Sequence, residues 1–405
     1  MEKTFHIRSE AGRQKFSQPR IALVHYWYFR HRGGERVFDV LADIFPYADI
    51  FFICYDQKAL PSNLRHHKIS SSFLNRLPQV KRYYRSLLPF FPIALEQFDL
   101  SGYDLVISHE AGPAKGVITR PDTRHICYCH TPMRYLWDMY HKYLSSAPGA
   151  IGKLVYSLSC HYVRNWDYQA SARVDQFVAS SLNSAKRIHK YYRRDAEVVY
   201  PPVDTTKYAI AERPSSDFYL VVSPLVDYKR IDLAIEACNR LKRRLVVIGD
   251  GEQARSLRRI AGPTISFLGF QPDEVVSHYY SNCRALLFPG EEDIGLTPIE
   301  AQASGRPVIA YGKGGVLETV KGFSPGMYSV PEKSSGVFFQ QQSVDSLIEA
   351  TLEFERFEGE FNPLFIRSQT SMFDQRHFRR KFAELAQVEW QVNSKREPKE
   401  PISAD

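Results

Sequence analysis

Short apolar runs alternate with amphipathic, helix-length segments along most of the chain, which is typical of βαβ units and parallel sheets. The runs fall into two series, separated by residues 201–218. That stretch begins with Pro201 and Pro202, which interrupt helices and inner strands because proline has no backbone N–H. The expected strands are 21–26, 49–54, 104–108, 125–129, 176–180 and 197–200 in the first series, and 218–223, 244–249, 264–269, 285–289, 307–311 and 336–339 in the second.

The two series predict an α/β protein with two Rossmann-like, doubly wound domains that face a central cleft. We assign residues 1–204 to the N-terminal domain and 205–374 to the C-terminal domain. A length of 405 residues agrees with two domains, because single cores stop growing beyond about 250–300 residues. The tail from 373 to 395 has a helical pattern. Its apolar side chains near one face are Phe378, Phe382, Leu385, Ala386 and Trp390.

The composition indicates which kinds of binding partner and which cellular compartment to expect. A net charge of +8 and a pI near 9.0 favour an anionic partner: nucleic acid, a phosphate-bearing substrate or an anionic bilayer. The six cysteines are scattered through apolar segments without the spacing of a disulfide framework, so we expect a reducing compartment. Residues 1–20 lack a signal-peptide core, and no run reaches the roughly 18 apolar residues of a membrane span. We therefore expect a cytoplasmic protein, free or peripheral to the inner face of the membrane.

The strongest chemical signal lies in residues 288–305, which follow an expected strand and open a helix. Glu292 and Glu300 are eight residues apart and can face one crevice. Carboxylates suit a sugar nucleotide because their two oxygens accept hydrogen bonds from vicinal hydroxyls. Between them, Gly295 allows close approach of a ligand, and Leu296 begins a run of amide donors for phosphate at the helix start. Alternatively, residues 297–300 form a capping box in which Glu300 only satisfies the helix end.

Two further candidates follow strands of the first domain. Gly33 and Gly34 precede a helix that we expect to begin near Glu35, and their amides could hold a phosphate or acceptor group. The alternative is a tight turn without a ligand. His130 lies just past the strand 125–129, where an isolated histidine is often structural. Zinc binding by the histidines and cysteines of 125–130 is disfavoured because no second Cys/His pair lies nearby.

These motifs together resemble glycosyltransferase family 4, a family of retaining enzymes with the two-lobed GT-B fold. The resemblance rests on Glu292 and Glu300 in their spacing, on the turn 304–308, on the loop 312–318 and on the segment 222–232. It covers roughly residues 21–320. Residues 129–138, CHTPMRYLWD, are similar to bacterial mannosyltransferases of polysaccharide and O-antigen assembly, a subgroup that mostly uses GDP-mannose.

The resemblance implies roles for the site residues. Glu300 would bind the donor ribose, Glu292 the donor hexose, and His130 a hexose hydroxyl. Lys229, with Arg230, would neutralise the diphosphate, whose negative charge grows as the glycosidic bond breaks. The alternative for both basic residues is an ordinary solvated helix face.

The family pattern also bears on neighbouring positions. Ser223 belongs to the phosphate-binding segment and is a donor-binding candidate. Pro224 stands where many family members carry arginine, so the phosphate contact rests more heavily on Lys229. In GT-B proteins the last helix returns to the first lobe, so residues 375–405 are expected to complete domain one. GT-B enzymes need no catalytic metal, so we expect neither a metal nor another cofactor besides the nucleotide sugar.

We therefore expect a retaining hexosyltransferase that transfers mannose from GDP-mannose to a lipid-linked or oligosaccharide acceptor, as in lipopolysaccharide or other cell-surface polysaccharide biosynthesis. A UDP-sugar is the alternative donor. A nucleic-acid-binding α/β protein is a weaker alternative, because the basic residues are spread and form no recognisable RNA motif. A catalytically inactive homologue is disfavoured because the four proposed catalytic and ribose-binding side chains are present.

Basic and apolar residues interleave in 79–98, where Lys81, Arg82 and Arg85 alternate with aromatic and aliphatic side chains. Such a segment suits contact with anionic lipid headgroups. A core-packed helix with a basic outer side explains it at least as well.

Overall fold

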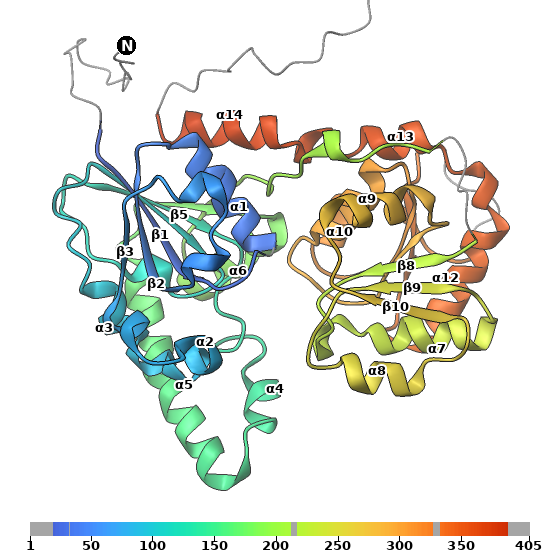
Figure 1. The fold of residues 1–405 in the computed structure, drawn as a ribbon, viewed down its shortest axis with the longest axis horizontal. Coiled ribbons are helices and arrows are strands. Elements are labelled where there is room, and N and C mark those ends of the chain that lie inside the picture. The colour runs from blue at the N-terminus through green and yellow to red at the C-terminus, as the bar shows by residue number, and fades with distance from the viewer. Residues whose placement is uncertain (1–18, 32, 212–216, 327–332, 388–405) are drawn as a thin grey trace, which may run out of the picture.

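The computed structural model describes residues 19–31, 33–211, 217–326 and 333–387. They form two domains, each built around one parallel sheet of seven strands with helices on both faces (Figure 1). The prediction of two doubly wound α/β domains is confirmed. No described helix is long and apolar enough to cross a membrane.

The first sheet has the strand order β3-β2-β1-β4-β5-β6-β7. The strands are β1 (Ile21–Tyr28), β2 (Asp49–Tyr55), β3 (Ile69–Ser71), β4 (Leu105–Glu110), β5 (Arg124–Cys129), β6 (Gln176–Ala179) and β7 (Ala196–Val198). In the centre, Leu23 of β1 pairs with Ile50 of β2 and Ile107 of β4. These central strands are apolar on both faces because helices cover both sides of a parallel sheet.

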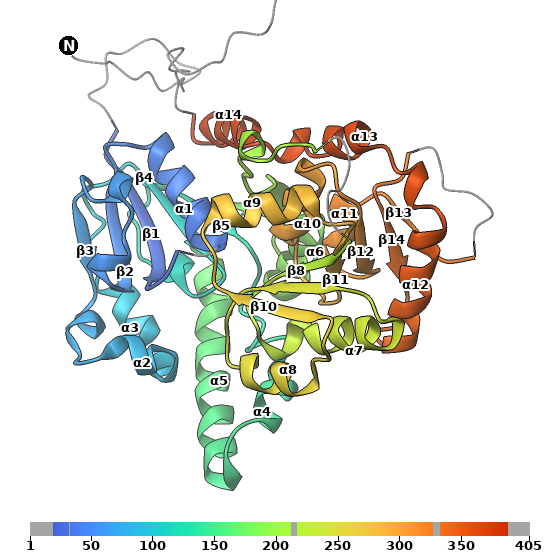
Figure 2. The same cartoon turned by 45° about the vertical axis from the view of Figure 1, so that its right-hand side comes forward.

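The helices of this domain are α1 (Gly33–Ile44), α2 (Val80–Tyr83), α3 (Phe91–Glu96), α4 (Tyr140–Ser145), α5 (Gly149–Ser171) and α6 (Leu182–Tyr192). Helix α1 begins at Gly33, two residues before the expected start. Helix α6 begins after Ser181, whose hydroxyl accepts a hydrogen bond from the Ser184 amide at 3.0 Å, as a side-chain cap does. Helix α5 is long and extends beyond the sheet (Figures 1 and 2).

The second sheet has the order β10-β9-β8-β11-β12-β14-β13. Its strands are β8 (Tyr219–Val222), β9 (Leu245–Ile248), β10 (Ile265–Gly269), β11 (Leu286–Phe288), β12 (Val308–Tyr311), β13 (Gly322–Phe323) and β14 (Gly336–Phe339). Its helices are α7 (Ile231–Leu241), α8 (Ala254–Ile260), α9 (Asp273–Asn282), α10 (Leu296–Ala303), α11 (Val316–Thr319), α12 (Val344–Arg356) and α13 (Pro363–Ser368).

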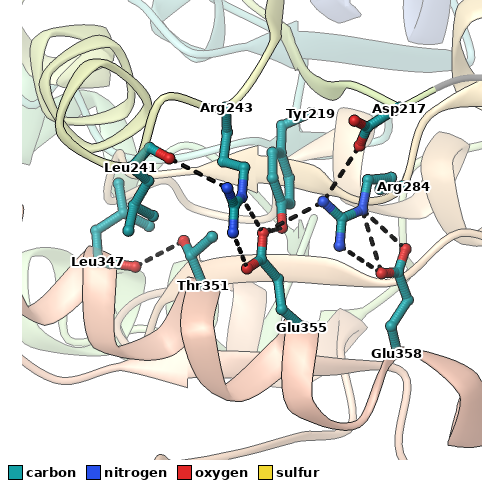
Figure 3. Close-up of polar contacts among 9 residues, drawn as sticks. All are labelled: Asp217, Tyr219, Leu241, Arg243, Arg284, Leu347, Thr351, Glu355 and Glu358. Atoms are coloured by element: carbon teal, nitrogen blue, oxygen red, sulfur yellow. Dashed lines mark hydrogen bonds and ion pairs between the residues drawn. The ribbon is translucent and has the colours of Figure 1, made fainter.

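An ion-pair network ties α12 to this sheet (Figure 3). The Glu355 carboxylate accepts hydrogen bonds from Arg243 Nε at 2.7 Å, from the Tyr219 hydroxyl at 2.9 Å and from Arg284 Nη1 at 3.2 Å. Arg284 also donates to Glu358. The network links β8, the turn before β9, the turn before β11 and the end of α12, so it braces the side of the sheet away from the first domain.

The chain crosses between the domains twice, and the two crossings pair with each other. The Val203 amide donates to the Phe373 carbonyl at 2.8 Å, and the Gln375 amide donates to the Val203 carbonyl at 3.0 Å. Helix α14 (Gln375–Leu385) then packs on the first domain, with Phe382 in contact with Phe45. Trp390 and the rest of the predicted helix to 395 lie outside the described residues.

Candidate active site

The candidate residues lie where strand order changes direction in each sheet. In the first sheet this point lies between β1 and β4, and in the second between β8 and β11. Ligands of doubly wound domains bind beyond the carboxyl ends of strands at this point. Gly33 follows β1, Ser223 follows β8 and Glu292 follows β11, while His130 follows β5, next to β4.

Lys229 and Glu292 form an ion pair in the second domain. The Lys229 side chain is buried. Burial is the largest single influence on its pKa and lowers it, but the neighbouring groups, above all the Glu292 carboxylate, together outweigh burial, so the pKa of Lys229 is raised. Lys229 is therefore a fixed cation at neutral pH. It can face the negative charge of a phosphate if a ligand replaces its carboxylate partner.

The loop that carries Glu292 is held by a glycine pair in the next loop. The Gly315 amide donates to the Glu292 carbonyl at 2.8 Å, and Gly314 pairs with Glu292 in an isolated bridge. A Cβ on Gly315 would lie 2.0 Å from the Asp293 carbonyl oxygen, and Gly314 has a φ of +78°. Only glycine fits this approach, so the two loops form one unit.

Glu300 lies in the fifth position of α10, because the helix begins at Leu296 and its N-cap is Gly295, with a φ of +76°. The capping-box alternative is wrong, since Thr297 is already inside the helix. The Glu300 carboxylate instead accepts a hydrogen bond from the Tyr280 hydroxyl at 2.8 Å. Its other oxygen lies 3.6 Å from Arg36 Nη1, which belongs to the first domain.

The start of α1 meets the start of α10 across the junction between the domains. A Cβ on Gly33 would lie 3.1 Å from Cδ1 of Leu296, so this glycine permits close approach of the two helix starts. On the same helix, Arg36 also pairs with Asp273 of α9. The structure therefore brings Gly33, Leu296 and Glu300 into one region, and Arg36 is an additional charged side chain there that the sequence pattern did not indicate.

His130 is the outer member of a row of three histidines: it directly follows β5, His109 lies near the end of β4, and His25 lies within β1. Nε2 of His130 lies 2.9 Å from Nε2 of His109, whose Nδ1 lies 3.0 Å from Nδ1 of His25. Burial lowers the pKa of His130 to about 4 and that of His25 to about 3. His130 is thus neutral at pH 7 and suited to hydrogen bonding with a hydroxyl group rather than to holding a charge.

Asp293, the residue after Glu292, links this half of the site to the first domain. Its carbonyl accepts from the Ser181 hydroxyl at 2.7 Å, and its carboxylate pairs with Arg187 Nη1 at 2.7 Å. Ser184, in the first turn of the same helix α6, donates to the His130 carbonyl. Helix α6 therefore connects His130 to the Glu292 loop, although His130 and Glu292 are 162 positions apart in sequence.

Glu318, at the end of the glycine loop, caps α6 from the other domain. Its carboxylate accepts from the amides of Leu182 at 2.7 Å and Asn183 at 2.8 Å. A carboxylate at a helix start is favoured by the free amides and by the helix dipole. The loop 312–318 thus contacts both the Glu292 loop and the first domain.

Three donor-binding candidates stand apart from these contacts. Arg230 Nη2 pairs with Asp232 at 2.9 Å, rather than with Glu292, and its φ of +52° places it at the start of α7. The Ser223 hydroxyl donates to the Pro224 carbonyl at 3.0 Å. Gly34 has more space than Gly33, since a Cβ there would meet only the Tyr26 hydroxyl at 4.0 Å.

The described residues contain no group of three or more His, Cys, Asp or Glu side chains that could hold a metal ion. Cys127 and Cys129, for which zinc binding is disfavoured from the sequence, are buried in an apolar cluster with Phe177 and Ile188.

Two family models match the two halves of the chain. Residues 32–207 match the model described as Glycosyltransferase Family 4, and residues 204–360 match the model described as Glycosyl transferases group 1.

Among curated proteins, the chain is similar to D-inositol 3-phosphate glycosyltransferase from Rhodococcus erythropolis, with 29% identity over 194 residues, which are 40% of this chain and 43% of that protein. The chain thus spans less than half of the length of that relative. It is also similar to O-antigen chain mannosyltransferase C from Escherichia coli, with 24% identity over 371 residues, 86% of this chain and 87% of that protein.

Among solved structures, HepE from Anabaena in complex with UDP and glucose has a similar fold. The TM-score is 0.63 at 14% identity, and the superposition covers 91% of this chain and 99% of HepE.

Proposed function

We propose that this chain, a GT-B glycosyltransferase by its fold and by the two family models that match its halves, transfers mannose from GDP-mannose to a lipid-linked or oligosaccharide acceptor. The transfer retains the anomeric configuration and serves cell-surface polysaccharide biosynthesis at the cytoplasmic face of the membrane. The observation that carries the proposal is the ion pair between the buried Lys229 and the partly exposed Glu292 at the carboxyl edge of the second sheet.

The ion pair suits a sugar diphosphate because each member matches one part of it. Lys229 faces the diphosphate and stabilises the charge that grows on it as the glycosidic bond breaks. Glu292, released from Lys229, accepts hydrogen bonds from hexose hydroxyls. Without a donor the two charges neutralise each other, so the buried lysine is never left unpaired.

Glu300 binds the ribose through the carboxylate oxygen that does not accept from Tyr280. Arg36 places positive charge beside this carboxylate, whose oxygens can accept hydrogen bonds from hydroxyl groups. The amides of Leu296 and Thr297, in the first turn of α10, have no partner within the helix and can donate to the diphosphate, whereas Pro298 has no amide hydrogen.

His130 belongs to the first domain and is neutral because it is buried. It forms a hydrogen bond with a hydroxyl group of the donor hexose. The motifs contain no candidate covalent nucleophile, so we propose attack from the same face as the leaving group. The acceptor oxygen bonds to the anomeric carbon as the bond from that carbon to the diphosphate oxygen breaks. The acceptor proton passes to the departing diphosphate.

Mannose is favoured by residues 129–138 and by the similarity to O-antigen chain mannosyltransferase C over 86% of the chain. A UDP-hexose is the second candidate, because HepE has the same fold and its structure contains UDP and glucose. The two family matches favour a transferase over the nucleic-acid-binding alternative.

Isothermal titration calorimetry with GDP, UDP, ADP and their sugars tests the donor. We expect GDP and GDP-mannose to bind at least about tenfold more tightly than UDP and UDP-glucose, a difference of about 1.4 kcal/mol. Preference for UDP would assign the second candidate. The absence of binding by every nucleotide would overturn the transferase proposal.

A further inference from the structure

Helix α5 has a buried half and a projecting half. In its C-terminal half, Cys160, Val163 and Ala170 are buried in the core of the first domain. Its N-terminal half extends beyond both sheets, together with α4, and forms the tip of the molecule in both views (Figures 1 and 2). A helix that leaves its domain in this way should have a polar surface unless the surface meets something else.

The projecting half instead carries an apolar stripe: Ile151, Leu154, Val155 and Leu158. Their spacing places them on one face of the helix. Their exposed fractions are 81%, 60%, 58% and 63%, and Tyr162, one turn further, is 48% exposed. Single exposed apolar side chains are common, but a contiguous row of large ones indicates an interaction surface.

The stripe lies in one of two segments whose own charged side chains are all basic. Two of these basic side chains pair with acidic residues elsewhere, Lys142 with Asp227 and Lys81 with Asp56. Residues 57–95 and 139–166 contain ten lysines and arginines and no aspartate or glutamate. The rest of the chain contains 43 of the 53 lysines and arginines and all 45 aspartates and glutamates, so its own net charge is slightly negative. The two segments therefore account for the whole net charge of +8. The segments are adjacent in space, since Leu88 and Phe91 pack in the same core cluster as Cys160 and Val163.

The outer side of the first of these segments has the same character. In residues 80–95, Val80, Leu88 and Phe91 are buried, whereas Tyr83 and Phe90 are 36% and 49% exposed. Part of this segment therefore packs in the core of the first domain and part of it is exposed.

We propose that the stripe on α5 docks on an anionic lipid bilayer, with the helix parallel to the surface and the four apolar side chains below the headgroups. An apolar face beside acid-free basic segments is the combination that interfacial helices use. A second copy of this chain is a poor occupant, because a symmetric contact would bring two patches of the same positive charge together. The inference does not depend on the donor or acceptor proposed above.

Flotation of the full chain with vesicles tests this inference without any substrate. The vesicles contain phosphatidylcholine alone or with about one third phosphatidylglycerol. The stripe variant Ile151→Ser/Leu154→Ser/Val155→Ser/Leu158→Ser is compared with a control of similar chemistry, Ile260→Ser/Leu352→Ser/Leu364→Ser. The control side chains are 40%, 46% and 72% exposed on the second domain. Thermal melts of both variants establish that they are folded.

We expect the wild type to float with the anionic vesicles, the stripe variant to bind them at least about tenfold more weakly, and the control to stay within about twofold. Binding of the wild type should fall as added salt shortens the Debye length from about 10 Å at 0.1 M. A wild type that does not float with anionic vesicles, or a folded stripe variant that floats equally well, would overturn the proposal. So would a wild-type dimer, measured by light scattering, that the stripe substitutions convert to a monomer, since a second copy would then cover the stripe.

A single substitution gives a second readout. Leu154→Trp places a fluorophore on the stripe, and brominated phospholipids in the anionic vesicles quench indole groups that lie below the headgroups. We expect stronger quenching than for Leu364→Trp on the second domain. Equal quenching of the two variants would contradict insertion of the stripe.

Discussion

The guanidinium group of Arg36 in the first domain lies 3.6 Å from the carboxylate of Glu300 in the second. The same arginine pairs with Asp273 on α9, so it bridges two helices of the other domain. Glu300 is thereby held between a cation and the Tyr280 hydroxyl, and it is largely buried, with a side-chain exposure of 10%. A largely buried carboxylate needs hydrogen-bond donors because little water reaches it, and the hydroxyls of a ribose would supply them.

Glu300→Ala should therefore remove donor binding and leave the fold intact. Two hydrogen bonds to a charged group contribute about 1.5–3 kcal/mol each, so donor affinity should fall at least a hundredfold by calorimetry. Tyr280→Phe is the matched control, because it removes the internal hydrogen bond but keeps the carboxylate. The donor affinity of Tyr280→Phe should fall by no more than about tenfold. A Glu300→Ala protein with wild-type donor affinity would exclude this carboxylate from the donor site.

Lys229→Ala should reduce turnover by about a hundredfold to a thousandfold at saturating donor, the range found when one electrostatic contact to developing charge is removed. Thermal stability should change little, because Glu292 is 21% exposed and water can solvate its carboxylate after the lysine is gone.

Arg230→Ala is the comparison for Lys229→Ala in steady-state kinetics. The Arg230 guanidinium group pairs with Asp232 and is 31% exposed. We therefore expect Arg230→Ala to lower turnover clearly less than Lys229→Ala does. Equal losses for the two variants would mean that Arg230 leaves Asp232 and shares the diphosphate.

The central strands could be predicted from sequence because they are buried on both faces and appear as continuous apolar runs. The strands that the pattern missed, β3 and β13, lie at sheet edges and have only three and two residues. Such short edge strands have no hydrophobic period of their own, and neighbouring strands determine them.

The Glu292 and Glu300 loop was visible because its signal is local. The capping-box alternative was wrong because the helix begins directly after Gly295, whose φ is positive, and therefore before Thr297. The sequence alone does not determine where a helix begins to within two residues. Arg36 and His109 were missed for a different reason. Arg36 reaches Asp273 across 237 positions, and His109 reaches His130 across 21, so only the packing of the domains and strands brings them to the site.

His130→Ala should lower kcat/KM by at least about tenfold through the loss of one hydroxyl contact, and the pH dependence separates this role from a structural one. Burial lowers the pKa of His130 to about 4, so wild-type His130 stays neutral down to that pH. The kcat/KM profile of the wild type should therefore show no loss from this residue between pH 7 and about pH 5, below the ordinary histidine pKa of about 6.5. A wild-type acid limb near pH 6.5 that disappears in His130→Ala would contradict the neutral, buried histidine.

Glu355→Gln should destabilise the second domain at neutral pH without affecting donor binding. The Glu355 carboxylate accepts hydrogen bonds from Arg243, Tyr219 and Arg284, and the bonds from Arg243 are the largest cause of its lowered pKa (Figure 3). Removal of the negative charge leaves two arginines without this partner, so we expect a loss of about 1.5–3 kcal/mol in the free energy of unfolding at pH 7, measured by urea denaturation.

The sign of the pH dependence follows from the lowered pKa. The folded state prefers ionised Glu355, so this stabilisation is fully present above the unfolded pKa, near the ordinary value of 4.5, and is lost as the pH falls through the lower folded pKa. The difference in unfolding free energy between the wild type and Glu355→Gln should therefore be constant from pH 7 to about pH 5 and shrink below about pH 4.5. Glu349→Gln, an exposed position on the same helix, should change stability by less than about 0.5 kcal/mol throughout. If the Glu355→Gln difference did not shrink in acid, the ionised carboxylate would not be the stabilising form, and the network would brace α12 through packing alone.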